Sequence, residues 1–144
     1  MTVRVTMFVE NPRHSRVHHR YDEKSLAFLG TASVVGSYPY PYGFIPNTKA
    51  EDGDCLDCYL LTERDVDRGG LYECEIVGLM EVWENDEEDH KVLLRFPDEI
   101  VDLQSETLKR FEQSAIPGSK TRVGRFLGVD GTIAYLQKFG LLST

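Results

Sequence analysis

The stretch that decides the fold is Tyr42-Gly-Phe-Ile-Pro-Asn-Thr-Lys-Ala-Glu-Asp-Gly-Asp-Cys-Leu-Asp-Cys-Tyr-Leu-Leu61. Its centre, from Asp52 to Asp57, holds three carboxylates within six residues and leads into the apolar run from Cys58 to Leu61. Carboxylates crowded in this way raise one another's pKa unless a cation neutralises them. Hard divalent cations such as Mg²⁺ prefer oxygen ligands of this kind. The stretch therefore predicts a cation-binding loop at the mouth of a buried strand.

Two other interpretations of this acidic loop have to be considered. A plain acidic surface turn would need no ligand, and the loop residues alone leave it open. An EF-hand would place Asp52, Asp54 and Glu63 at the first, third and twelfth ligand positions. That pattern fails because Leu56 stands at its fifth position and Asp57 stands where it needs glycine.

Composition limits the class of protein. With 144 residues, of which 41% are hydrophobic, we expect one domain over residues 1–144 with a real apolar core. The net charge of -8 argues against nucleic-acid binding, which relies on basic surfaces. No apolar run approaches the roughly 20 residues of a membrane span, and the first ten residues lack the apolar centre of a signal peptide. We expect a cytoplasmic protein.

The chain has three cysteines, Cys55, Cys58 and Cys74, and an odd number does not suggest a disulfide framework. The pair Cys55 and Cys58 has a spacing that redox sites and zinc sites use. A thioredoxin-like pair would start a helix, whereas this pair leads into a strand-like run, and zinc would need further ligands. We expect the cysteines to be small apolar fillers.

Periodicity predicts an α+β fold that is mainly β. Alternation predicts strands over residues 3–10 and 71–82, with a bulge or bend at Gly78. The apolar run over 58–61 predicts a buried strand, and residues 92–96 form the return strand after a hairpin tip over 84–91. Helices come late, over residues 105–115 and again after Asp130 as N-cap, with Phe139 on its apolar stripe and Gly140 after it. Short strands joined by such turns favour a barrel or a sandwich.

Two further segments carry candidate anion contacts. Residues 13–20 form the strongly basic segment of the chain, which is either a solvated loop or an edge that faces an anion. Residues 37–43 hold three tyrosines separated by prolines. Proline enforces extended, irregular backbone there, and tyrosine hydroxyls can donate hydrogen bonds to an anion.

The pentapeptide Tyr42-Gly-Phe-Ile-Pro46 followed by the acidic motif resembles the signature of the soluble family I inorganic pyrophosphatases. Cys55 and Cys58 stand where that family usually has proline and an apolar residue. A weaker resemblance extends over residues 8–139 and includes Val9-Glu-Asn-Pro12 and Asp89-His-Lys91. It implies an OB-like, closed or partly open β-barrel with two C-terminal helices, a Mg²⁺-dependent hydrolase of pyrophosphate, and commonly a homo-hexamer.

The resemblance also implies roles for particular side chains. Pyrophosphate is a dense anion, and two metals about 3.5–4 Å apart can activate a shared water and clamp the phosphate. Mg²⁺ is the expected metal, with Mn²⁺ or another divalent cation as an alternative. By resemblance, the metals would be held by Asp52, Asp57, Asp89 and Glu84. Asp54 would take the proton of the attacking water with help from Glu10, and phosphate oxygens would be contacted by Lys91, Tyr38 and Tyr42.

This chain departs from the family on the side that would hold phosphate. One inserted residue aligns Arg20-Tyr21-Asp22 with the family's Lys-Tyr-Glu, and Arg20 then keeps one cation. The arginine expected about a dozen residues later is absent, and the late Tyr-Lys pair is replaced by Ser114 and Ala115. Candidate replacements for the lost cations are Arg13, Arg16, His18, His19, Lys120 and Arg122.

Three functions follow as hypotheses. A divergent Mg²⁺-dependent pyrophosphatase accounts for the retained acids and tyrosines. A hydrolase of another phosphoanhydride, such as a nucleotide, would account for the altered basic segment over residues 13–20. A metal-binding paralogue with weakened or no catalysis would account for the lost arginine and the Tyr-Lys pair.

Overall fold

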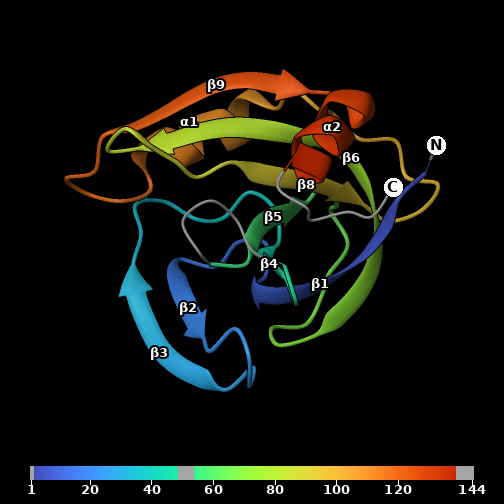
Figure 1. Ribbon diagram of the computed structural model, residues 1–144. Coiled ribbons are helices and arrows are strands. Elements are labelled where there is room, and N and C mark those ends of the chain that lie inside the picture. The colour runs from blue at the N-terminus through green and yellow to red at the C-terminus, as the bar shows by residue number, and fades with distance from the viewer. Residues whose placement is uncertain (1, 49–53, 139–144) are drawn as a thin grey trace.

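The structure is a computed structural model that describes residues 2–48 and 54–138 (Figure 1). The order of its elements is mostly β, then α with one late strand. In chain order they are β1 (Arg4–Asn11), β2 (Val17–Tyr21), β3 (Phe28–Ser33), β4 (Tyr42–Ile45), β5 (Leu56–Leu60), β6 (Leu71–Glu84), β7 (Glu87–Glu88), β8 (Lys91–Arg95), α1 (Glu106–Ser114), β9 (Thr121–Leu127) and α2 (Val129–Lys138).

Five strands close into a barrel in the order β1, β4, β5, β8 and β6, and β6 pairs again with β1. Neighbouring strands are antiparallel except β5 and β8, which run parallel. Closure removes the free edges that would otherwise expose unpaired backbone groups. The predicted OB-like β-barrel with two helices is confirmed, and the barrel is closed.

Strand β6 pairs with several other strands because it is long and bent. Its first residues pair with β1, its middle pairs with β8, and its last residues pair with β9 and β7. The register with β8 shifts between Ile76 and Gly78. A Cβ at Gly78 would lie 2.6 Å from the carbonyl oxygen of Leu127, so the backbones approach too closely there for a side chain. The predicted bulge at Gly78 is confirmed.

Alternate positions of the strands fill the barrel interior. Leu56, Cys58 and Leu60 of β5 lie in this inner core, and Leu136 of α2 packs into it. Asp57 and Tyr59 therefore project from the opposite face of β5, since successive side chains of a strand alternate. The alternation directs the acid of the signature motif out of the core.

Helix α1 lies against the outer face of the barrel (Figure 1). Its Leu108 and Phe111 form a second apolar cluster with strand residues such as Tyr59 and Leu93. Ser105 caps the helix, because its side chain accepts a hydrogen bond from the backbone amide of Leu108 at 3.2 Å. The packing fixes which side of α1 faces β5 and β8.

The structure differs from the sequence predictions in three places. β9 was not expected, and it extends the sheet along the end of β6. The basic segment ends as β2, which pairs with β3 in a separate two-stranded sheet. The last helix begins at Val129, so Asp130 lies in its first turn and is not its N-cap. Phe139 and Gly140 lie outside the described residues. Within residues 2–48 and 54–138, no helix is long and apolar enough to cross a membrane.

The Gly43→Ala substitution tests the closure of the barrel at β1 and β4. A Cβ at Gly43 would lie 1.9 Å from the carbonyl oxygen of Phe8, so β4 would have to move away from β1. We expect the free energy of unfolding to fall by about 1–3 kcal/mol or more, measured by urea denaturation. In Gly131→Ala, the matched control in α2, the new Cβ makes an ordinary contact of 3.4 Å. The control is expected to be neutral or stabilising by up to about 1 kcal/mol. Equal effects would contradict this account of β4.

Candidate functional site

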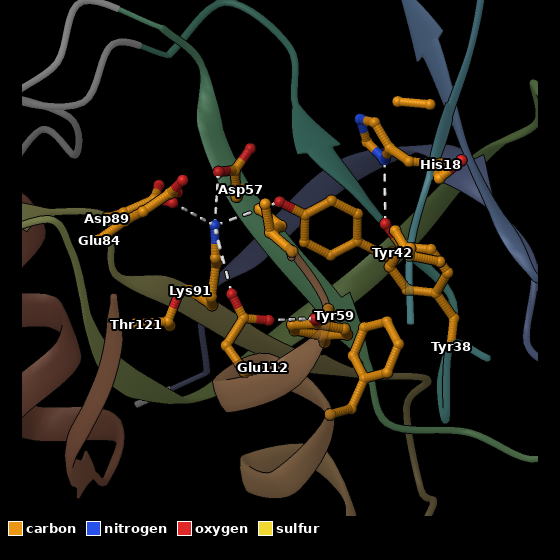
Figure 2. A pocket seen from close by; sticks show the side chains of 16 residues that line it. His18, Tyr38, Tyr42, Asp57, Tyr59, Glu84, Asp89, Lys91, Glu112 and Thr121 are labelled. Carbon is orange, nitrogen blue, oxygen red and sulfur yellow. Dashed lines mark hydrogen bonds and ion pairs between the residues drawn. The ribbon is translucent and has the colours of Figure 1, made fainter. Parts of the chain in front are cut away.

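Two cavities open beside the signature strand and share His18, Tyr42 and Asp57 in their walls. The first has a volume of about 280 Å³ and lies between β5, β8 and α1. The second, of about 990 Å³, is lined mainly by polar side chains of β2, the turn after β2 and the acidic loop. A ligand that reaches across both cavities would lie against Asp57, and Figure 2 shows the acidic end of the first one.

At that acidic end, carboxylates converge on one ammonium group (Figure 2). Lys91 Nζ lies 2.9 Å from Asp57 Oδ2 and 2.9 Å from Asp89 Oδ2. It lies 3.9 Å from Glu112 Oε1 and donates to the Tyr42 hydroxyl at 3.2 Å. The parallel pairing of β5 with β8 creates this cluster, because Cys58 stands opposite Val92 and so sets Asp57 beside Lys91.

Lys91 is buried, with 3% of its side chain exposed. Burial alone would lower its pKa, but the carboxylates of Asp57, Glu112 and Asp89 outweigh burial and raise the pKa well above its usual value. The ammonium is therefore charged near neutral pH. One positive charge faces three carboxylates, and this end of the cavity keeps an excess of negative charge.

Two acids of the site have strongly raised pKa values. Burial, followed by repulsion from Asp57, raises the pKa of Glu10 to about 8. Burial also raises the pKa of Asp89 to about 7; the Asp57 carboxylate adds to the shift and Lys91 opposes it. Crowded carboxylates with raised pKa values are those that a bound cation would neutralise.

The chemistry of these donors fits a hard divalent cation. Asp57, Asp89 and Glu84 present carboxylate oxygens to the same cavity, and Mg²⁺ binds through one or two carboxylates while it keeps several waters. In the described part of the chain, no three acidic, histidine or cysteine side chains are gathered closely enough to hold a metal by themselves. The predicted ligand Asp52 lies outside the described residues.

The second cavity brings together the predicted acid–base residues and a cation. Glu10 of β1, Arg20 of β2 and Asp54 of the acidic loop all line it, together with Tyr42 and Asp57. Glu23 ties the turn after β2 to this loop, because its carboxylate accepts a hydrogen bond from the Cys55 amide at 3.0 Å. Asp22, which the alignment pairs with a family glutamate, lines the same cavity and caps its own turn by accepting from the amides of Lys24 and Ser25.

Tyr38 and Tyr42 stack on each other, with ring centroids 5.4 Å apart, beside His18. Burial raises the pKa of both hydroxyls well above the usual value, so both keep their protons. His18 Nδ1 lies 3.0 Å from the Tyr38 hydroxyl and 3.0 Å from the Asn11 amide nitrogen. Burial lowers the pKa of His18, and its ring is therefore a neutral partner near pH 7.

Glu112 is a site residue that the sequence reasoning missed. It comes from α1 and accepts a hydrogen bond from the Tyr59 hydroxyl while it faces Lys91. The one signal in the sequence for Glu112 is its position four residues after Leu108. This spacing places Glu112 next to the buried stripe of the helix. That signal does not say which strand the helix covers.

The lost cations have no full replacement among the described residues. Ala115 and its neighbour Ile116 line the first cavity where the family has a lysine, and Ser114 donates to the carbonyl of Arg110. Of the candidate replacements, His18 lines both cavities, whereas Arg13 approaches Glu63 at 3.8 Å and Arg122 stacks over Trp83 at 4.0 Å. No contact with either cavity is found for the remaining candidates, Arg16, His19 and Lys120.

The cysteines are free, and Cys58 and Cys74 are buried in the inner core. Burial raises the pKa of both thiols, so neither is a reactive thiolate at neutral pH. Cys55 is half-buried. The prediction of apolar filling is confirmed for Cys58 and Cys74.

The raised pKa of Glu10 predicts how stability changes with pH. In the metal-free protein, the folded state holds the Glu10 proton up to about pH 8, whereas the unfolded state releases it near 4.5. The folded state binds more protons in this window, so the free energy of unfolding falls as the pH rises through it. We expect Glu10→Gln to have a flatter profile between pH 5 and pH 8, measured by urea unfolding with a chelator present. The exposed control Glu73→Gln should keep the parental slope, and equal slopes in all three proteins would contradict the assignment.

Comparisons with known proteins identify the family of the chain. The family model described as "Inorganic pyrophosphatase" matches residues 7–125. The inorganic pyrophosphatase of Mycoplasma pneumoniae is 31% identical over 136 residues, which cover 93% of this chain and 70% of that protein. The Campylobacter jejuni inorganic pyrophosphatase is 28% identical over 110 residues, which cover 75% of this chain and 63% of that protein.

Solved structures show the same fold. The inorganic pyrophosphatase of Thermus thermophilus superposes with a TM-score of 0.83 at 26% identity, covering 93% of this chain and 87% of that one. The inorganic pyrophosphatase of Coxiella burnetii gives a TM-score of 0.80 at 26% identity, covering 94% and 92% of the two chains. The chain belongs to the family I inorganic pyrophosphatases.

Proposed function

We propose that this protein hydrolyses inorganic pyrophosphate to two phosphates in a Mg²⁺-dependent reaction. The observation that carries the proposal is the cluster of Asp57, Asp89 and Lys91 in the first cavity, in which Asp57 also lines the second cavity. It combines oxygen donors for a hard cation with a fixed ammonium for a phosphate oxygen. The relatives that share the fold are named inorganic pyrophosphatases, which supports the same substrate here.

Asp57, Asp89 and Glu84, together with Asp52, are the side chains that would hold the metal ions. Bound divalent ions would supply a water of lowered pKa and would offset the negative charge of the substrate. Mg²⁺ is the first choice because every donor is an oxygen, and Mn²⁺ shares this preference. The excess of carboxylates over Lys91 supports cation binding, because the acidic end has more negative charge than the ammonium neutralises.

Asp54 is the proposed acceptor of the proton that the attacking water loses. It lines the second cavity beside Asp57, and Glu10 lines the same cavity and would assist. The oxygen of the water forms a bond to one phosphorus while the bridging P–O bond breaks. The departing phosphate leaves with the bridging oxygen.

The phosphate oxygens would be held by Lys91, Tyr38, Tyr42 and Arg20. The tyrosine hydroxyls keep their protons because burial raises their pKa, so they can donate hydrogen bonds to an anion. Donors placed where charge develops stabilise the transition state. Arg20 lines the second cavity and would supply a positive charge there.

Removal of the proposed base tests this function. We expect Asp54→Asn to lower the rate of phosphate release from pyrophosphate by about 10²–10⁴-fold, the usual contribution of a general base. The exposed control Asp65→Asn should retain the parental rate, and a chelator should abolish activity until Mg²⁺ is restored. Mg²⁺ binding by calorimetry without any turnover would favour the non-catalytic paralogue instead.

We also propose a cytoplasmic homo-oligomer, a hexamer by resemblance to the family. Large apolar side chains that are at least half exposed support an interface between copies of the chain. They include Phe28, Leu29, Val35 and Leu71. Burial of apolar surface is the dominant favourable contribution to most protein–protein association. Sedimentation at micromolar concentration should give six times the chain mass of 16.4 kDa, and a monomer alone would contradict the proposal.

A further inference from the structure

The first cavity has two chemically different ends. One end carries the Lys91 cluster and Glu84, as described above. The other end is apolar and is formed by the last part of β3, the segment after it and the end of α1. Its apolar residues are Ala32, Val34, Phe111, Ala115 and Ile116.

Contacts within the fold hold the apolar end of the cavity in place. The amide of Val35 donates a hydrogen bond of 2.8 Å to the carbonyl of Ala115, which joins the two segments directly. Val34, Phe111 and Ala115 belong to the outer apolar cluster, and Phe111 packs on Tyr38 with ring centroids 4.7 Å apart. Ile116 is 49% exposed and stands where the wall meets solvent. The wall is therefore anchored on one side and accessible on the other.

Inorganic pyrophosphate would gain no binding free energy from this apolar end. Apolar surface contributes to binding only when it removes apolar ligand surface from water, and pyrophosphate has none. The neighbouring polar cavity of about 990 Å³ offers room for the diphosphate group against Asp57 and Arg20. The volume of about 280 Å³ of the first cavity is near the lower limit for small-molecule sites, about 300–1,000 Å³. The acidic end takes part of this volume, so the apolar end suits a small substituent, such as one ring or a short branched alkyl group.

We propose that this apolar end binds the uncharged organic substituent of a diphosphate monoester, which makes such esters substrates of the same site. The inference rests on the proposed function, because the diphosphate group would occupy the same metal and phosphate contacts. The oxygen of water forms a bond to the terminal phosphorus and the bridging P–O bond breaks. The products are one phosphate and one organic monophosphate, and Asp54 receives the proton and passes it to solvent.

Hydrolysis of three substrates with Mg²⁺ tests the inference. We would measure kcat/KM for inorganic pyrophosphate, methyl diphosphate and phenyl diphosphate. The apolar end should raise kcat/KM for the phenyl ester at least about tenfold over the methyl ester, because the ring is buried against an apolar wall. A phenyl ester that is no better than the methyl ester would overturn the inference.

Charge placed in the wall should remove that preference. Ala115→Lys puts an ammonium into the apolar end, and Ile116→Lys does so at a half-exposed position where folding is not at risk. We expect both variants to bring the phenyl-to-methyl ratio close to one. Gln113→Lys adds the same charge to an exposed position of α1 that does not line the cavity, and it should keep the parental ratio. Unchanged ratios in both wall variants would contradict the inference.

The two proposals fail in different ways. If pyrophosphate is hydrolysed and neither ester is, the proposed function stands and the inference is wrong. If no substrate is hydrolysed, the proposed function is wrong, and calorimetry with Mg²⁺ and the phenyl ester of methylenediphosphonate still decides the inference. Binding at least about tenfold tighter than the methyl analogue, lost in Ile116→Lys, would support the apolar end as a binding site; equal binding would overturn it.

Discussion

The structure depends on the buried ammonium of Lys91, which lies 2.9 Å from each of two carboxylates and 3.9 Å from a third. Breaking such a buried pair by removing one partner costs about 3–5 kcal/mol, because the remaining charges stay buried without compensation. Parallel pairing of β5 with β8 brings Lys91 to Asp57, and α1 brings Glu112. The Lys91 ammonium thus links β5 and β8 to α1 on the outer face of the barrel. The carboxylates still outnumber it, and this imbalance is what makes the site suitable for metal ions.

The proposed phosphate-holding side of the site carries fewer cations than the family pattern to which the sequence was compared. Where that pattern has a lysine near the end of the first helix, this chain has Ala115, whose carbonyl accepts the Val35 amide. His18 faces both cavities but is neutral near pH 7, since burial lowers its pKa. Arg20 remains as a cation in the wall of the second cavity. The replacement of that lysine by Ala115 therefore removes a charge and adds an apolar side chain to the lining of the first cavity.

The sequence predicted the parts of the molecule whose signals are local. The apolar run from Cys58 to Leu61 predicted a buried strand, which is β5, and the alternation of side chains along that strand directs Asp57 away from the core. Gly78 predicted the bend of β6, because a glycine inside a strand pattern is itself a local signal of a bulge. Glu112 and β9 could not be predicted, because each depends on which surface of the barrel a later segment covers. The exposed hairpin of β2 and β3 lacks a buried face of its own, so its strands leave little periodicity to read. Asp52, the first acid of the motif, lies outside the described residues.

The most direct measurement is a crystal structure with Mn²⁺ and phosphate, in which anomalous scattering locates the metal independently of the protein. We expect a metal bound by the carboxylates of Asp57 and Asp89, with Lys91 Nζ turned from at least one of them toward a phosphate oxygen. A structure without metal at these carboxylates, in which Lys91 still bridges both, would contradict the claim that this cluster is the metal-holding half of the site.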